Sequence, residues 1–212
     1  MPTVIVDYDS GNLHSAEKSF QRMAHETGAG SVLVSSSPEV IAKADRIVLP
    51  GVGAFADCRR VLAEHTGLFE AMEERVIKGG APFLGICVGM QMMATRGREN
   101  VDTPGFDWIA GEVVRITPSD PTLKIPHMGW NDLVVSQSHP LLAGIATGDH
   151  VYFVHSFHVK TADPATCLAS VDYAGPVIAA IGRDNLFGTQ FHPEKSQATG
   201  LRLIANFLHW QP

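Results

Sequence analysis

The stretch "PFLGICVGMQ" (residues 82–91) places a cysteine between two glycines, after a short apolar run and before a helix-like run. A buried structural thiol needs no glycines, whereas a nucleophile on a tight strand-to-helix turn needs small neighbours because the backbone passes close on both sides. The pattern G-x-C-x-G around Cys87 has this form. The positive end of the following helix favours a thiolate, and the Val88 N–H can donate to an oxyanion. A structural thiol stays the alternative, and it is our interpretation of Cys58 and Cys167, which lack this frame.

Upstream of this stretch, short apolar runs alternate with helix-like patterns. Strands are predicted at residues 3–6, 32–34, 46–49 and 82–86. Helices are predicted at residues 12–24, from Ser37-Pro38-Glu39 onward, and at about 67–78. Such alternation is typical of βαβ units around a mainly parallel sheet. The strands are almost continuously apolar, which indicates that helices cover both faces of the sheet.

After about residue 104 the chain becomes rich in strand-like runs. They lie at residues 111–116, 152–159, 166–173, 176–182 and 186–191. We interpret them as an antiparallel or mixed extension of the same sheet, closed by a helix whose apolar stripe runs from Leu201 to Leu208. The sequence therefore predicts an α/β fold in a single domain spanning residues 1–212.

The composition limits the classes of function. The chain has 212 residues, 45% of them hydrophobic and 18% charged, with a net charge of -6. This acidic balance argues against a nucleic-acid-binding surface. The opening "MPTVIVDY" has no secretory signal pattern, and no apolar run approaches the ~20 residues of a membrane span. Three cysteines without a CxxC pair fit a reducing compartment, so we expect a cytoplasmic protein without disulfides.

A cysteine nucleophile needs a base, and "GTQFHPEKS" (188–196) offers one. His192 precedes a proline and is biased toward extended backbone, where residues two apart point to the same side. The carboxylate of Glu194 can therefore lie beside the imidazole and orient it, as in a catalytic triad. A solvated surface loop is the alternative.

The glycine-rich loop "PGVGAFA" (50–56) resembles a dinucleotide-binding fingerprint, but it follows the third predicted strand and lacks the acidic residue expected about 20 positions later. The third and fourth strands should be neighbours, so their carboxyl ends share one crevice. Gly51 and Gly53 permit close backbone approach there, and this loop can supply a second oxyanion donor facing Cys87. A plain structural turn is equally compatible with the sequence.

No metal or cofactor site is expected. His155 and His158 are three apart in a predicted strand and so face opposite sides, which makes them a poor metal pair. The sequence also has no HExxH motif and no cluster of metal-ligand residues.

Taken in chain order, several motifs resemble the class I, or triad, glutamine amidotransferases. The resemblance is closest to the branch that works in histidine biosynthesis, in which the glycine loop is Gly51-Val52-Gly53 rather than PGG. It extends from the first strand to the last helix. The motifs are "VIVDYDSGNLHS" (4–15), "PGVGAF" (50–55), "GICVGMQ" (85–91), "PHMGWN" (126–131), "YFVHSF" (152–157) and "GTQFHPEKS" (188–196).

The resemblance implies a role for each matching residue. Cys87 is the nucleophile, His192 the base and Glu194 its orienter. The other implied positions are the oxyanion-hole donors Val88 and Gly53, the glutamine-binding residues Gly51, Gln91, His155, Ser156 and Phe157, and the partner-facing residues Asn12 and Lys195. Phe157 departs from the tyrosine of many relatives, which matters little if the backbone makes the contact.

The implied reaction is hydrolysis of L-glutamine to glutamate and ammonia through a Cys87 thioester. The implied partner is a separate (β/α)8 cyclase, in a heterodimer, that uses the ammonia on a phosphoribulosyl aminoimidazole carboxamide intermediate. We expect the chain alone to be slow and the docked, liganded cyclase to activate it, with the peptide around Val52 as a flexible switch.

Other interpretations of the residues remain open. They are another triad glutaminase, such as the one that feeds pyridoxal phosphate synthesis, a cysteine hydrolase or esterase on an α/β fold, and a non-catalytic binding module. Choice of synthase partner, cleavage of model esters and the effect of Cys87→Ala discriminate among them.

Overall fold

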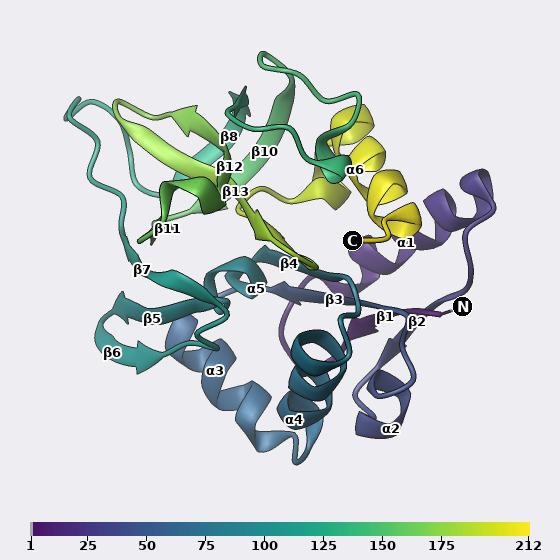
Figure 1. Cartoon of the computed structure of the whole chain (residues 1–212). Helices are drawn as coiled ribbons and strands as arrows, with labels where there is room; N and C mark the ends of the chain where they lie inside the picture. The colour runs from purple at the N-terminus through teal and green to yellow at the C-terminus, as the bar shows by residue number, and fades with distance from the viewer. Residues whose placement is uncertain (1) are drawn as a thin grey trace.

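A twisted eight-stranded sheet forms the centre of the computed structural model, which describes residues 2–212 (Figure 1). In spatial order its strands are β2 (Val32–Ser35), β1 (Thr3–Val6), β3 (Arg46–Gly51), β4 (Phe83–Cys87), β14 (Leu186–Thr189), β13 (Pro176–Arg183), β12 (Cys167–Asp172) and β9 (Val134–Val135). The first five are parallel to one another, and β13, β12 and β9 continue the sheet in antiparallel fashion. The predicted α/β fold with a mixed central sheet is confirmed.

Helices cover both faces of the parallel strands (Figure 1). On one face lie α1 (Leu13–Thr27) and α6 (Gln197–His209), where Phe20 and Phe207 meet edge to face at 6.3 Å. On the other lie α2 (Pro38–Ile41), α3 (Phe55–Glu64) and α4 (Leu68–Glu73), and α4 runs on into a π-helical turn (Glu74–Lys78). None of the helices within residues 2–212 is long and apolar enough to cross a membrane.

Local sequence explains where these elements begin and end. All four residues of β1 are buried, as expected for a strand covered on both sides. The Ser37 hydroxyl accepts from the Val40 N–H at 3.4 Å and caps α2, with Pro38 at the first helical position. Gly28 ends α1 in the left-handed conformation that glycine adopts without strain.

Two smaller sheets correct the prediction for the second half. A four-stranded sheet has the order β11 (Phe157–Thr161), β7 (Ile109–Arg115), β5 (Ala94–Glu99) and β6 (Val101–Pro104), and a two-stranded sheet pairs β8 (His127–Asp132) with β10 (His150–His155). We expected the runs at 111–116 and 152–159 to extend the central sheet, as the runs at 166–173, 176–182 and 186–191 do. Instead the run at 152–159 breaks at Ser156 into strands of different sheets, and the strand-rich region begins at Ala94 rather than near residue 104.

The parallel register brings the candidate segments to one edge of the central sheet. Gly51, at the end of β3, lies opposite Cys87, at the end of β4. On the other side of β4, Thr189 of β14 lies opposite Ile86, and the chain then continues to His192. Three segments distant in sequence therefore meet where α/β sheets commonly bind ligands.

Candidate active site

Cys87 lies at a strained corner between β4 and the single-turn helix α5 (Val88–Gln91). Its φ of 56° and ψ of -111° are unusual for a residue with a side chain. Both flanking glycines are required. A Cβ on Gly85 would lie 2.7 Å from the Gly89 carbonyl oxygen, and a Cβ on Gly89 would lie 1.8 Å from the Leu49 carbonyl oxygen. The tight turn predicted from the sequence is present, but the helix after it has only one turn.

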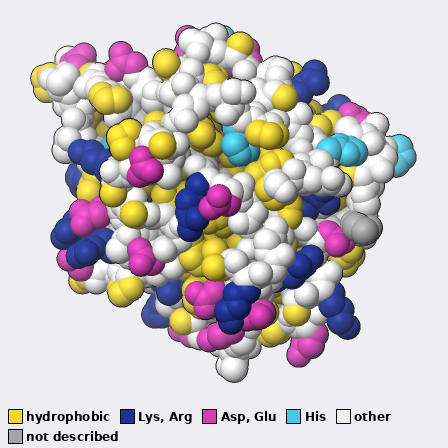
Figure 2. Space-filling view, in the orientation of Figure 1, with side chains coloured by type: hydrophobic (Ala, Val, Ile, Leu, Met, Phe, Trp, Pro, Cys, Tyr) yellow, Lys and Arg dark blue, Asp and Glu magenta, His cyan; other side chains and the backbone are white. Residues whose placement is uncertain are grey.

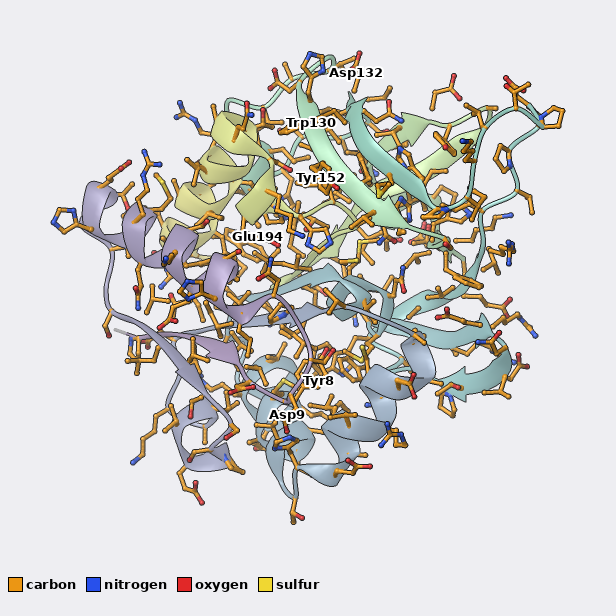
Figure 3. The ribbon with its side chains drawn as sticks, turned by 180° about the vertical axis from the view of Figure 1, so that it is seen from behind. Tyr8, Asp9, Trp130, Asp132, Tyr152 and Glu194 are labelled. Atoms are coloured by element: carbon orange, nitrogen blue, oxygen red, sulfur yellow. The ribbon has the colours of Figure 1, made fainter. Side chains whose placement is uncertain are left out.

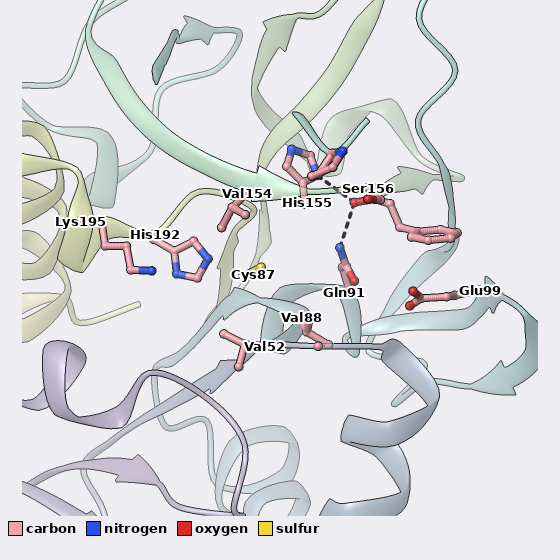
Figure 4. Close-up of a pocket in the computed structure, with 13 residues that line it drawn as sticks. Val52, Cys87, Val88, Gln91, Glu99, Val154, His155, Ser156, His192 and Lys195 are labelled. Atoms are coloured by element: carbon pink, nitrogen blue, oxygen red, sulfur yellow. Dashed lines mark hydrogen bonds between the residues drawn. The ribbon is translucent and has the colours of Figure 1, made fainter. Parts of the chain in front are cut away.

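His192 and Glu194 form a buried pair. The imidazole of His192 lies near Cys87 (Figure 4). Nδ1 of His192 lies 2.9 Å from Oε1 of Glu194, and both side chains are 3% exposed. A carboxylate only accepts, so Nδ1 donates to Glu194, and Nε2 remains for other contacts. That Nε2 is buried and has no hydrogen-bond partner within the described chain. Burial lowers the pKa of His192, but the neighbouring Cys87 sulfur and the Glu194 carboxylate outweigh burial and raise it to about 10.

Two glutamine side chains connect the cysteine to the opposite wall of the site. Nε2 of Gln190 donates to the Cys87 sulfur at 3.7 Å, and its Oε1 accepts from Nε2 of Gln91 at 3.0 Å. Gln91 also donates to the Phe157 carbonyl oxygen at 3.0 Å (Figure 4). Gln190 was not among the residues predicted from the sequence, and its polar side chain at the end of an otherwise apolar run was the available signal.

A cavity of about 330 Å³ opens above Cys87. This size is within the usual range for small-molecule sites. Its lining residues are Val52, Gly53, Cys87, Val88, Gln91, Glu99, Pro126, Val154, His155, Ser156, Phe157, His192 and Lys195. The structure thus brings together nine of the site residues singled out from the sequence.

Glu99 is a lining residue that was not predicted from the sequence. It lies at the end of β5, and its Oε2 accepts from the Phe55 N–H at the start of α3, at 2.8 Å. This contact fixes a carboxylate at the edge of the cavity that contains Cys87. A carboxylate there can pair with a positively charged group on a ligand.

Gly51 lies below the cavity rather than in its wall. A Cβ at this position would come within 2.7 Å of the Tyr8 hydroxyl and 2.9 Å of the Gly89 nitrogen, so the packing of β3 against the Cys87 turn requires glycine. Gly53 does line the cavity and has a φ of 98°, a conformation that side-chain-bearing residues rarely adopt.

Of the two residues expected to face a partner, one lines the cavity and the other does not. Lys195 lines the cavity, and its ammonium lies 5.9 Å above the ring of Tyr152. Asn12 precedes the first residue of α1, caps no N–H with its side chain, and does not line the cavity. Asn12 therefore lies outside the cavity wall, although the helix that follows it packs against the segment Pro193–Lys195.

The histidine pattern differs from the expectation. Because the strand breaks at Ser156, the alternation of sides does not continue from His155 to His158, and both side chains are buried. Within residues 2–212 no group of three or more His, Cys, Asp or Glu side chains is arranged to hold a metal ion.

Comparison with known proteins agrees with this fold. A family model described as "Glutamine amidotransferase class-I" matches residues 4–210. The chain therefore belongs to the class I glutamine amidotransferase family of enzymes.

Solved structures share the fold at low sequence identity. One titled "Crystal structure of glutamine amidotransferase" has a TM-score of 0.72 at 17% identity, and the match covers 97% of this chain and 96% of that one. A glutamine amidotransferase from Thermotoga maritima has a TM-score of 0.62 at 16% identity, over 92% and 76% of the two chains.

Curated relatives are similar over their whole length. Three of them, each named "Imidazole glycerol phosphate synthase subunit HisH", come from Cereibacter sphaeroides, Ruegeria pomeroyi and Rhodospirillum rubrum. They are 69%, 63% and 58% identical to this chain, and each alignment covers 100% of both proteins.

Proposed function

We propose that this chain is the glutaminase subunit of imidazole glycerol phosphate synthase, hydrolysing L-glutamine and passing ammonia to a synthase partner. The observation that supports the chemistry best is the buried His192–Glu194 pair beside Cys87 at a strained strand end. The whole-length similarity to HisH proteins supports the choice of synthase.

In the proposed reaction the Cys87 thiolate attacks the side-chain carboxamide carbon of glutamine and forms a carbon–sulfur bond. The tetrahedral oxyanion is stabilised by the N–H groups of Val88 and Gly53. As the carbon–nitrogen bond breaks, protonated His192 gives its proton to the nitrogen, and ammonia leaves. Water then attacks the thioester, His192 takes a proton from that water, and glutamate leaves as the thiolate re-forms. Glu194 keeps the imidazole oriented and stabilises its charge.

We further propose how the amino-acid end of glutamine is held. The free oxygen of Glu99 can pair with the α-ammonium group, while Gln91 and the backbone from His155 to Phe157 form the facing wall. The Phe157 carbonyl already accepts from Gln91 and His155, so contacts with glutamine come from other atoms of this wall.

The proposed partner is a separate (β/α)8 cyclase in a cytoplasmic heterodimer, with this chain as one amidotransferase domain over residues 1–212. An apolar surface close to the cavity is compatible with docking, because Met128 is 66% exposed and Trp130 is 49% exposed. The ring of Trp130 lies 5.9 Å from the ring of Tyr152 (Figure 3). The ammonium of Lys195 lies over that Tyr152 ring. Lys195 is proposed to face the partner there. Asn12 is proposed to contact it from the start of α1. On the face in Figure 2, basic and acidic side chains are intermixed, which favours a protein partner over nucleic acid.

The test is glutamate release from L-glutamine by three samples: the chain alone, the chain with the liganded cyclase, and the same complex carrying Cys87→Ala. We expect slow release by the chain alone, strong stimulation in the complex, and loss of release in the variant. Cys167→Ala, which changes a cysteine remote from the cavity, is the matched control and should behave like the parent.

Absence of glutamate under every condition, from protein with native circular dichroism, would refute the glutaminase proposal. Glutamate release that responds to the synthase of another pathway and not to this cyclase would refute the choice of partner.

A further inference from the structure

A line of hydrogen bonds runs behind the cavity from the partly buried Asn131 through the buried side chains of His127 and His155. Nδ2 of Asn131 lies 3.3 Å from Nε2 of His127, Nδ1 of His127 lies 3.0 Å from Nε2 of His155, and Nδ1 of His155 lies 2.8 Å from the Phe157 carbonyl oxygen. The last contact and the Gln91 contact meet on the same oxygen (Figure 4). His127 and His155 are opposite each other in the pairing of β8 with β10.

The carbonyl at one end determines the direction of every bond. Because a carbonyl only accepts, Nδ1 of His155 must carry a proton, which leaves Nε2 of neutral His155 as an acceptor. Nδ1 of His127 must then donate to it, and Nε2 of His127 must accept from the Asn131 amide. The same amide nitrogen donates to the Asp172 carbonyl at 3.0 Å, which supports its orientation.

The surroundings keep both imidazoles neutral and in place. His127 is 3% exposed, and its ring packs against Phe153 at 4.7 Å and Tyr173 at 4.1 Å. Burial lowers the pKa of His127 to about 4 and that of His155 to about 3. Near neutral pH a single pattern of donors and acceptors is therefore maintained along the line.

We propose that His127 and Asn131 are positioning residues for glutamine binding: they orient His155, which holds the Phe157 carbonyl and with it the cavity wall from His155 to Phe157. This inference rests on the proposed function. It gives a role to the motif "PHMGWN" (126–131). Along strand β8, His127 and Asn131 belong to the hydrogen-bonded line, whereas Met128 and Trp130 between them are exposed. Neither His127 nor Asn131 lines the cavity, so both act through His155.

The test compares two variants of His127 in the complex with the liganded cyclase. His127→Phe keeps a ring against Phe153 and Tyr173 but removes the donor to His155. His127→Asn keeps an N–H near the position of Nδ1 and loses most of the ring. We expect His127→Phe to raise the KM for glutamine about five- to tenfold, the effect of one lost neutral hydrogen bond, with kcat within about twofold of the parent. On a logarithmic scale, the increase in KM caused by His127→Asn should be at most half of the increase caused by His127→Phe.

Two further readouts separate positioning from general damage. Alkylation of Cys87 by iodoacetamide, which is too small to need the wall, should proceed at the parent rate in both variants. Nitrogen-15 spectra of the parent should show His127 and His155 as neutral Nδ1–H tautomers.

An unchanged KM in His127→Phe, a larger defect in His127→Asn than in His127→Phe, or an Nε2–H tautomer at either histidine would overturn the proposal. If the parent complex releases no glutamate, the proposed function fails and this inference fails with it. If the parent is active and only the KM effect is missing, the proposed function stands and the positioning role is rejected.

Discussion

Replacing Glu194, the buried carboxylate beside the proposed base, should show most clearly how much this carboxylate stabilises the protonated imidazole. Glu194→Gln keeps the size of the side chain but removes a negative charge 2.9 Å from Nδ1 of His192, where both groups are 3% exposed. A charge-assisted hydrogen bond contributes about 1.5–3 kcal/mol, and one pKa unit corresponds to about 1.4 kcal/mol. The pKa of His192, raised to about 10 in the parent, should therefore fall by about one to two units.

This shift has a definite sign in the pH dependence of the rate. His192 must be protonated to give its proton to the leaving ammonia, so activity is lost as pH rises through its pKa. The alkaline limb of kcat should move from about pH 10 to about pH 8–9 in Glu194→Gln. The rate at the optimum should also fall by about 10²- to 10⁴-fold, since loss of the carboxylate in serine triads costs about 10⁴-fold.

The assay is glutamate release by the cyclase complex from pH 6 to pH 11, with the folded fraction followed by circular dichroism at each pH. Glu74→Gln, which removes an exposed carboxylate paired with Lys78, is the matched control and should leave the profile unchanged. A Glu194→Gln enzyme with the parent rate and the parent alkaline limb would show that the carboxylate neither orients nor stabilises the imidazolium, and the triad reasoning would be wrong.

Three further predictions concern other parts of the site. Gly53→Pro removes an N–H and cannot adopt the φ of 98°, so stimulated glutamate release should fall about 10²- to 10³-fold, whereas undiminished activation would reject the proposed switch in this loop. Ser196→Ala leaves the Tyr152 N–H and the His192 carbonyl without their buried hydroxyl partner, so urea unfolding should show a loss of about 1–3 kcal/mol, and an unchanged midpoint would contradict this. Burial lowers the pKa of His158 to about 4, so the folded protein resists protonation of this side chain and its stability should fall as pH drops below about 6.5. His158→Phe should make that decline in unfolding free energy shallower by up to about 1.4 kcal/mol per pH unit. An equal slope in the variant and the parent would count against this.

Local sequence patterns were sufficient for the elements that meet at the site. The apolar runs of β1, β3 and β4 and the two glycines around Cys87 follow from backbone sterics and burial, which a short window of sequence contains. The contact of His192 with Glu194 was predicted, but from the wrong geometry: only His192 is extended, and a 3-10 turn over Pro193–Lys195 places Glu194 beside its imidazole.

Long-range placement was beyond such patterns. Glu99 reaches the cavity because β5 pairs with β7 and its carboxylate accepts from the Phe55 N–H, and no residue near Glu99 in sequence signals either contact. Gln190 reaches the sulfur of Cys87 from the end of β14, 103 positions away in the chain. The break at Ser156 sends neighbouring segments into different sheets, a choice made by tertiary packing rather than by strand propensity.

The backbone at Cys87 also has a consequence for how this protein tolerates change. A positive φ of 56° with ψ of -111° costs a residue with a side chain about 1–3 kcal/mol, and glycine would adopt it freely. Folding alone therefore favours loss of the thiol at this position. The proposed role of Cys87 as nucleophile gives selection a reason to keep a residue that stability alone disfavours.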